Sequence, residues 1–264
     1  MKRGLGLILS IAAGLLAAAP PARAEDGYRL WLRYPETAAA TSSIEVERHS
    51  PMIDAAAAEL RRGLANRVAH VLLLSTADPR VAVLRLSQPL GEEGYAIRSA
   101  TIGGQSAVIV AAESERGLLY GAFALLRHLD SGGSSSAIAL QSAPRVKLRV
   151  VDHWDNLDGF VERGYSGSSL WDWWTLPAWR DPRYTDYARA EASLGINGVV
   201  LNNVNAKADS LTAPYIAKAA ALADVFRPYG IKVYLSARFS APIEIGGLKT
   251  ADPLDPGVRA FWKA

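Results

Sequence analysis

Polar and aromatic residues follow three short apolar runs in the second half of the chain. Residues 147–152 lead into HWDNLDG, residues 198–201 lead into NNVN, and residues 232–237 lead into RFS. Carboxylates can transfer protons, a tryptophan face can pack on a sugar ring, and asparagine amides can hydrogen-bond hydroxyl groups. If the three runs are neighbouring parallel strands, these groups collect at one edge of the sheet, where β/α barrels build their sites.

The spacing between the apolar runs predicts that helices connect them. Residues 184–194 and 213–229 have helical periodicity, and Gly195 and Gly230 follow them as left-handed end residues would. Buried strands alternating with helices form right-handed βαβ units. A third helix starts near Pro256. We therefore expect an α/β fold in which residues 144–264 form the first three βα units of an incomplete (β/α)8 TIM barrel.

The first of these connections is unusually long. It runs from Asp152 to Gly198 and contains ERGY at 162–165, LWDWW at 170–174 and Trp179. A long loop at the carboxyl end of a barrel strand is more often part of a site than filler. Asp155, Asp158 and Glu162 are the carboxylates of this stretch.

The first half of the chain predicts a small N-terminal α+β domain, residues 25–143. We expect strands at 28–34, 81–86, 95–99 and 107–112 and helices at 54–66 and 115–129. The Ser- and Gly-rich residues 131–136 predict a flexible turn or short linker. Glu113 and Glu115 are interpreted as solvated charges at a helix start, in preference to a catalytic pair.

The first 24 residues have the pattern of a secretory signal peptide. Two basic residues precede an apolar stretch that is too short to span a bilayer, and Ala22-Arg23-Ala24 suits signal peptidase. Removing this segment removes three of the 29 basic residues and leaves 26 against 26 acidic ones. We expect a secreted or periplasmic protein, with no support for a nucleic acid or membrane partner.

Composition also limits the cofactors. The chain has no cysteine, and its four histidines show no metal-ligand spacing. We therefore expect neither a metal nor another cofactor.

The order GYAI, polar turn, AVIVAA and ERGLLYGAFALLRHL resembles the small domain that precedes the barrel in several glycoside hydrolase families, including β-hexosaminidases and α-glucuronidases. The strings HWDNLDGFVERGYSGSSLWDWW, LGINGVVLNNVNA and SARFSAP resemble the α-glucuronidases of glycoside hydrolase family 67 more specifically. HWDN, ERGY and NNVN are specific in combination, and the similarity runs from about Tyr28 to the last residue.

The resemblance implies an inverting, metal-free hydrolysis by carboxylates. Its substrates are aldouronic oligosaccharides from glucuronoxylan, from which glucuronic acid or its 4-O-methyl form is released by cleavage of an α-1,2 link. Trp154 matches the tryptophan that packs on the uronic acid, and Val204 matches the valine beside the 4-O-methyl group. Asn202, Asn203 and Asn205 could bind hydroxyls or tie loops together. The full-length enzyme could be a homodimer.

No catalytic residue is assigned within the chain. In this family the catalytic carboxylates come from later strands, so we expect them beyond Ala264; Asp155, Asp158 and Glu162 match other positions. Glu162 and Arg163 are interpreted as an ion pair or loop brace in preference to a substrate contact. We expect an N-terminal portion of a longer α-glucuronidase. The alternatives to an α-glucuronidase are another two-domain glycoside hydrolase, such as a β-hexosaminidase, and a non-catalytic sugar-binding remnant.

Overall fold

The computed structural model describes residues 32, 34, 42–86 and 89–264. It divides into two compact units, residues 1–33 and 34–264, and the account below concerns the second. The predicted signal peptide and all but two residues of the predicted strand 28–34 lie outside the described residues. Both expectations therefore stay predictions.

Five strands form a mixed sheet in the first half of this unit. Their order is β1-β2-β4-β3-β5; β1, β2 and β4 are parallel, whereas β3 runs antiparallel to both β4 and β5. The run AVIVAA lies in β4, and its residues are buried because strands cover both edges and helices cover one face. The strands are Ser43–Val46, His70–Ser75, Tyr95–Ile102, Gln105–Ala112 and Ala139–Ser142, in the order β1 to β5.

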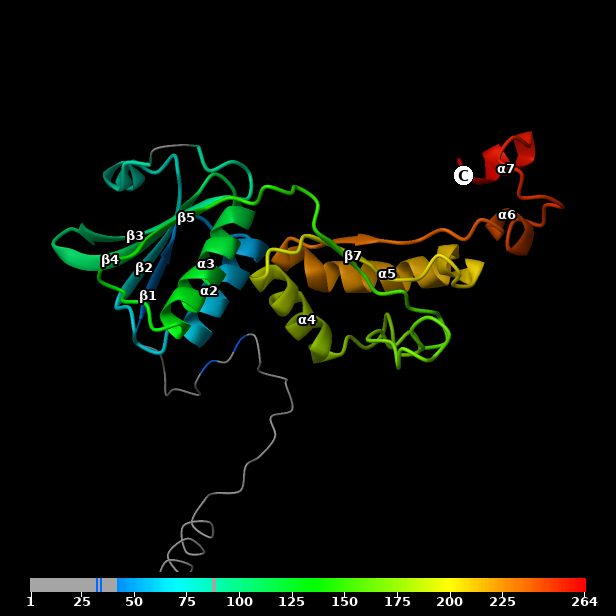
Figure 1. The fold of residues 1–264 in the computed structure, drawn as a ribbon, viewed down its shortest axis with the longest axis horizontal. Coiled ribbons are helices and arrows are strands. Elements are labelled where there is room, and N and C mark those ends of the chain that lie inside the picture. The colour runs from blue at the N-terminus through cyan, green and yellow to red at the C-terminus, as the bar shows by residue number, and fades with distance from the viewer. Residues whose placement is uncertain (1–31, 33, 35–41, 87–88) are drawn as a thin grey trace, which may run out of the picture. The chain divides into compact units, whose positions relative to one another are not determined.

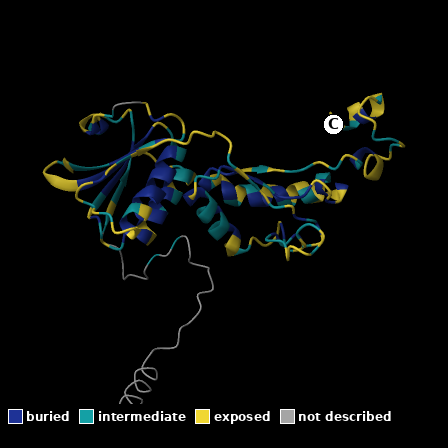
Figure 2. Cartoon of the chain, viewed as in Figure 1, coloured by how far each residue is buried: buried dark blue, intermediate teal, exposed yellow. Residues whose placement is uncertain are grey.

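Two helices, α2 (Pro51–Gly63) and α3 (Glu115–Asp130), lie side by side against the sheet (Figure 1). Ser50 and Ser114 cap them, each accepting a hydrogen bond from the backbone N–H three residues later. Gly121 lets α3 approach the sheet closely, since a Cβ there would lie 2.4 Å from a methyl group of Val110. Figure 2 shows the resulting core as continuous buried residues along α3 and the strands.

The prediction of a strand at residues 81–86 is wrong. Residues Pro79–Leu84 form a 3-10 helix that Asp78 caps. Val81 and Leu84 are buried whereas Val83 is 56% exposed, so the apolar residues face the core with a spacing of three rather than two. The sequence analysis also missed β1, β2 and β5, while it found β3, β4, α2 and α3.

A second sheet of three parallel strands follows: β6 (Val150–Asp152), β7 (Gly198–Val200) and β8 (Lys232–Tyr234). The intervening helices are α4 (Pro182–Ser193) and α5 (Ala213–Phe226), so the predicted βαβ order is confirmed with shorter strands. Gly195 and Gly230 have φ of 80° and 71°, the left-handed conformation that their positions predict. The remaining elements are two 3-10 turns, Ala208–Leu211 and Arg227–Tyr229, and the short helices α6 (Ala241–Glu244) and α7 (Pro256–Phe261).

Among the described residues, every helix is too short or too polar to cross a bilayer.

Candidate functional site

The segment after β6, residues 153–169, is called the β6 loop, and it is held together largely by its own backbone. Asp155 forms an isolated antiparallel bridge with Val161, and Phe160 forms another with Ser168. The N–H of Glu162 donates to the carbonyl of Trp154 at 2.9 Å. The β6 loop is therefore an ordered structure with its own backbone hydrogen bonds, and more than a simple connection.

Two of its non-glycine residues have left-handed backbone conformations. Trp154 and Glu162 both have φ of 53°. Residues with a Cβ adopt this region at a cost, and such residues often lie at binding sites. The hydrogen bond between their backbones holds both conformations together. Trp154 itself is 44% exposed.

The segment after β7, residues 202–206, is called the β7 loop, and Asn203 joins it to the β6 loop. The N–H of Asn203 donates to the carbonyl of Asp155 at 2.9 Å. Its side-chain amide donates to Asn156 Oδ1 at 3.2 Å and Glu162 Oε2 at 3.3 Å. Asn203 is only 3% exposed, so the structure shows it tying the two loops together.

The other two asparagines differ sharply. Asn202 is 1% exposed, and its amide makes a reciprocal pair of 2.9 Å hydrogen bonds with the backbone N–H and carbonyl of Ser236 beyond β8. Asn205 is exposed, and its carbonyl accepts from Arg238 at 3.1 Å. Val204 between them is 48% exposed, beside the loop junction made by Asn203. Sugar binding by these residues and by Trp154 stays a prediction.

Asp155 belongs to the β6 loop and is fully buried. One carboxylate oxygen accepts a hydrogen bond from the Ser169 hydroxyl, and the other has no hydrogen-bond partner among the described residues. Burial raises the pKa of Asp155 to about 6, and the Ser169 hydrogen bond only partly opposes this rise. The sequence analysis named Asp155 but did not foresee Ser169, because nothing in the spacing of the two residues indicates their contact.

An aromatic cluster anchors the loop to the helices. Trp171 is buried and packs against His153, Tyr187 and Phe226, with ring centroids 4.9, 5.3 and 5.7 Å away. His153 also shares a 2.7 Å hydrogen bond with the Tyr187 hydroxyl, and burial lowers the pKa of the imidazole. These aromatic residues therefore hold the site in position and do not line it.

Glu162, a further carboxylate of the loop, acts mainly as a brace. Glu162 is largely buried and accepts from Asn203, whereas Arg163 is 85% exposed with its Nε 3.9 Å from the Glu162 carboxylate. The ion pair is thus long, and the brace runs through Asn203. Over residues 42–86 and 89–264, no three His, Asp or Glu residues are grouped as a metal site would need.

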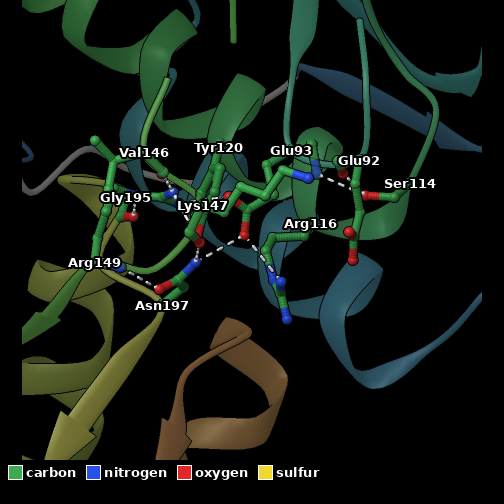
Figure 3. Close-up of polar contacts among 11 residues, drawn as sticks. Glu92, Glu93, Ser114, Arg116, Tyr120, Val146, Lys147, Arg149, Gly195 and Asn197 are labelled. Atoms are coloured by element: carbon green, nitrogen blue, oxygen red, sulfur yellow. Dashed lines mark hydrogen bonds and ion pairs between the residues drawn. The ribbon is translucent and has the colours of Figure 1, made fainter. Parts of the chain in front are cut away.

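A second polar cluster lies at the opposite, amino-terminal ends of the strands (Figure 3). The carboxylate of Glu93 accepts from Arg116 at 2.9 Å, Arg149 at 2.7 Å and Asn197 at 3.0 Å. Burial alone would raise the pKa of Glu93, but these three hydrogen bonds together hold it below its ordinary value. The beginnings of β6 and β7 are therefore fixed to the first sheet.

A cavity of about 400 Å³ adjoins this cluster, and Lys147, Lys232 and Tyr234 contribute to its walls. It lies at the wrong end of the parallel strands for a barrel site, which forms at their carboxyl ends. Two of its charged residues, Glu93 and Arg116, form an ion pair with each other, and Glu93 also holds Asn197.

Comparison with known proteins identifies the family. The glycosyl hydrolase family 67 N-terminus matches residues 30–125, and the family's middle domain matches residues 128–264. The chain belongs to glycosyl hydrolase family 67. The resemblance inferred from HWDN, ERGY and NNVN is thereby confirmed, and the β-hexosaminidase alternative is excluded.

The relatives of this chain include fungal proteins named probable alpha-glucuronidase A. The protein of Aspergillus oryzae is 38% identical over 90% of this chain, and that of Aspergillus niger is 33% identical over 99%. A shorter match to the Aspergillus terreus protein reaches 44% identity over 59% of the chain. The chain spans only 31% and 33% of the length of the first two relatives.

Solved structures show related folds at low sequence identity. A GH138 enzyme targeting pectin rhamnogalacturonan II has a TM-score of 0.53 at 16% identity, covering 83% of this chain and 28% of its own. A GH115 4-O-methyl-alpha-glucuronidase with specificity for decorated arabinogalactans has a TM-score of 0.52 at 13% identity, covering 86% and 34%. At such identities the likeness concerns the fold alone.

Proposed function

We propose that this chain is the uronic-acid-binding portion of a xylan-debranching α-glucuronidase. The whole enzyme would cleave the α-1,2 link between glucuronic acid, or its 4-O-methyl form, and xylo-oligosaccharides. Membership of family 67 and the names of the relatives support this activity. The three parallel strands with their helices would be the start of a (β/α)8 barrel, preceded by an N-terminal domain at 25–143 and an export signal at 1–24.

The junction between the β6 and β7 loops carries the proposal. Trp154 and Val204 are each one residue away from the 2.9 Å hydrogen bond between Asp155 and Asn203. Both side chains are nearly half exposed although their neighbours Asp155 and Asn203 are buried. An exposed indole and an isopropyl group on adjacent loops suit the ring face and the 4-O-methyl group of one sugar.

We assign the catalytic carboxylates to the part of the family's sequence that this chain does not cover. Inverting hydrolysis needs an acid and a base ~6.5–9.5 Å apart across the scissile bond. Asp155 is fully buried and Glu162 is engaged with Asn203, so neither is free to take these roles.

Calorimetric titration with 4-O-methyl-glucuronic acid tests the proposal. Wild-type chain should bind, and Trp154→Ala should weaken binding about tenfold, which corresponds to about 1.4 kcal/mol. Val204→Ser should reduce the preference for the methylated over the unmethylated acid. Equal binding by wild type and Trp154→Ala would contradict the proposed site, and release of uronic acid from aldotetraouronic acid by the chain alone would overturn our assignment of the catalytic carboxylates.

A further inference from the structure

An exposed tryptophan, Trp174, covers one edge of the β6 loop. Its side chain is 69% exposed. A Cβ built on Gly159 would lie 2.7 and 2.8 Å from two atoms of the indole ring, which is closer than real Cβ contacts come. The ring therefore occupies the space directly beside the Cα of Gly159, and Gly159 has φ of 85°.

The backbone on both sides of this contact is fixed. The N–H of Trp174 donates to Asp172 Oδ1 at 3.2 Å, and the carbonyl of Gly159 accepts from Ser169 at 2.7 Å. Phe160, the next residue after Gly159, is 50% exposed and its N–H donates to Asp158 Oδ1 at 3.2 Å. Trp174 thus lies against a glycine of an ordered loop, and an exposed phenylalanine follows that glycine in the chain.

Charged groups of both signs lie near these residues. Asp158 and Asp172 accept backbone hydrogen bonds, and neither has an ion pair with a described Lys, Arg or His residue. Lys218 Nζ donates to the carbonyl of Trp173, the residue before Trp174. Carboxylate and ammonium groups can both hydrogen-bond hydroxyl groups, and an exposed indole can pack on a sugar ring. This surface therefore suits a neutral sugar ring.

Gly159, which Trp174 contacts, is linked to the candidate site through Asn156. The N–H of Gly159 donates to the carbonyl of Asn156 at 3.3 Å, and the side chain of Asn156 accepts from Asn203 at the loop junction. In the proposed substrate the acid sugar is attached to a chain of neutral pyranoses. The β6 loop is one surface that this chain can follow from the acid-binding position.

We infer that Trp174 forms a platform that binds a neutral pyranose ring of the oligosaccharide chain attached to the uronic acid. The inference rests on the proposed function and adds a second position to that site. The platform supplies binding to the chain, whereas Trp154 and Val204 supply binding to the acid sugar. The two contributions can be measured separately because the two kinds of sugar are available as separate ligands.

Calorimetry on the full chain with xylotetraose and with glucuronic acid tests the platform. Trp174→Ala should weaken xylotetraose binding about tenfold and leave glucuronic acid binding unchanged. Trp179→Ala is the matched control, because Trp179 is 59% exposed on the same segment; it should change neither. Trp154→Ala should show the opposite pattern to Trp174→Ala. If the wild-type chain binds xylotetraose but not glucuronic acid, the result counts against the proposed function and not against the platform.

A glycine pair tests the same platform without removing the ring. Gly159→Ala and Gly167→Ala both place a side chain at positive φ, 85° and 96°, so both carry backbone strain. Only the Cβ at Gly159 meets Trp174, since nothing lies within 4 Å of one at Gly167. Gly159→Ala should therefore weaken xylotetraose binding several-fold more than Gly167→Ala. The inference is overturned if wild type does not bind xylotetraose, or if the members of either pair behave alike.

Discussion

Glu93 and Asn197 are 104 positions apart in the chain and are joined by a 3.0 Å hydrogen bond from the asparagine amide to the carboxylate. Asn197 also accepts from the N–H of Arg149 at 2.9 Å, and its carbonyl accepts from Lys232 at 3.0 Å. One asparagine therefore sets the relative positions of β6, β7 and β8 at their beginnings. Glu93 fixes that asparagine to the first sheet, so the register that presents the β6 and β7 loops depends on it.

Glu93→Gln should destabilise the chain by about 3 kcal/mol, because it leaves the charges of Arg116 and Arg149 without their carboxylate in a largely buried place. Urea unfolding measures the difference. Glu92→Gln is the control on the adjacent, exposed residue, and it should change stability by less than about 0.5 kcal/mol. Equal effects of the two substitutions would show that Glu93 does not hold the strands.

Asp155 should make the stability depend on pH in the opposite sense to most carboxylates. Its pKa rises from 3.8 to about 6 on folding, so the folded state binds the proton more tightly than the unfolded state. This group therefore favours folding at low pH and loses that contribution as pH rises from about 4 to about 6.

Asp155→Asn, which cannot ionise, removes the dependence. Wild type should lose about 2–3 kcal/mol of stability relative to this variant between pH 4 and pH 7. Unfolding free energies measured at pH 4, 5, 6 and 7 check the difference. If the two proteins run parallel across this range, Asp155 is not a protonated buried acid.

A buried ion pair connects α2 to α4 and should show strong coupling. Arg189 holds both carboxylate oxygens of the fully buried Glu59, at 2.6 and 3.0 Å. Replacing either residue with Met should cost about 3–5 kcal/mol, and the double variant should cost less than the sum, because neither Glu59 nor Arg189 is then left as a buried charge without the other.

The exposed pair Arg180 and Asp224, 3.4 Å apart, is the matched comparison for that double-mutant cycle. Its coupling energy should be at most about 1 kcal/mol. Urea denaturation of the wild type and the six variants of the two cycles supplies the values. Similar coupling in the two pairs would show that burial does not strengthen the contact between α2 and α4.

Alanine substitutions at Asn202 and Asn205 should differ in their effect on stability, because Asn202 is a buried tie between loops and Asn205 is exposed. Asn202→Ala leaves both the N–H and the carbonyl of Ser236 without their partner, and it should cost about 1–3 kcal/mol of stability. Asn205→Ala removes an exposed side chain and should cost less than about 0.5 kcal/mol. Thermal unfolding of the two variants checks this order, and a destabilised Asn205→Ala would contradict it.

Much of the fold could be predicted from local patterns. The helices α2 and α3 and the strand β4 have strong periodicity or continuous apolarity, and they occur where expected. The short strand β1 has no such signal, because pairing with β2 rather than its own sequence defines it. At residues 81–86 apolar alternation was misleading, because Asp78 and Pro79 begin a 3-10 turn.

The need of Glu59 for a buried partner was visible in the sequence pattern but was not predicted. Glu59 lies among Ala56, Leu60 and Gly63 on the apolar face of α2, where a carboxylate requires a partner. Sequence alone could have flagged it. Its partner, Arg189, lies 130 positions away in the chain. Which residue pairs with Glu59 depends on how α4 packs and could not be predicted from the sequence.

Residue types and their spacing along the chain were enough to predict the family, the alternation of strands and helices from β6 to β8, and the three loops that carry polar and aromatic residues. The tertiary structure decided which of those residues are exposed and which are braces. Asn202 and Asn203 are buried ties while Val204 between them stays exposed, and Trp174 lies against Gly159. These roles depend on contacts between segments far apart in the chain, which no local pattern encodes.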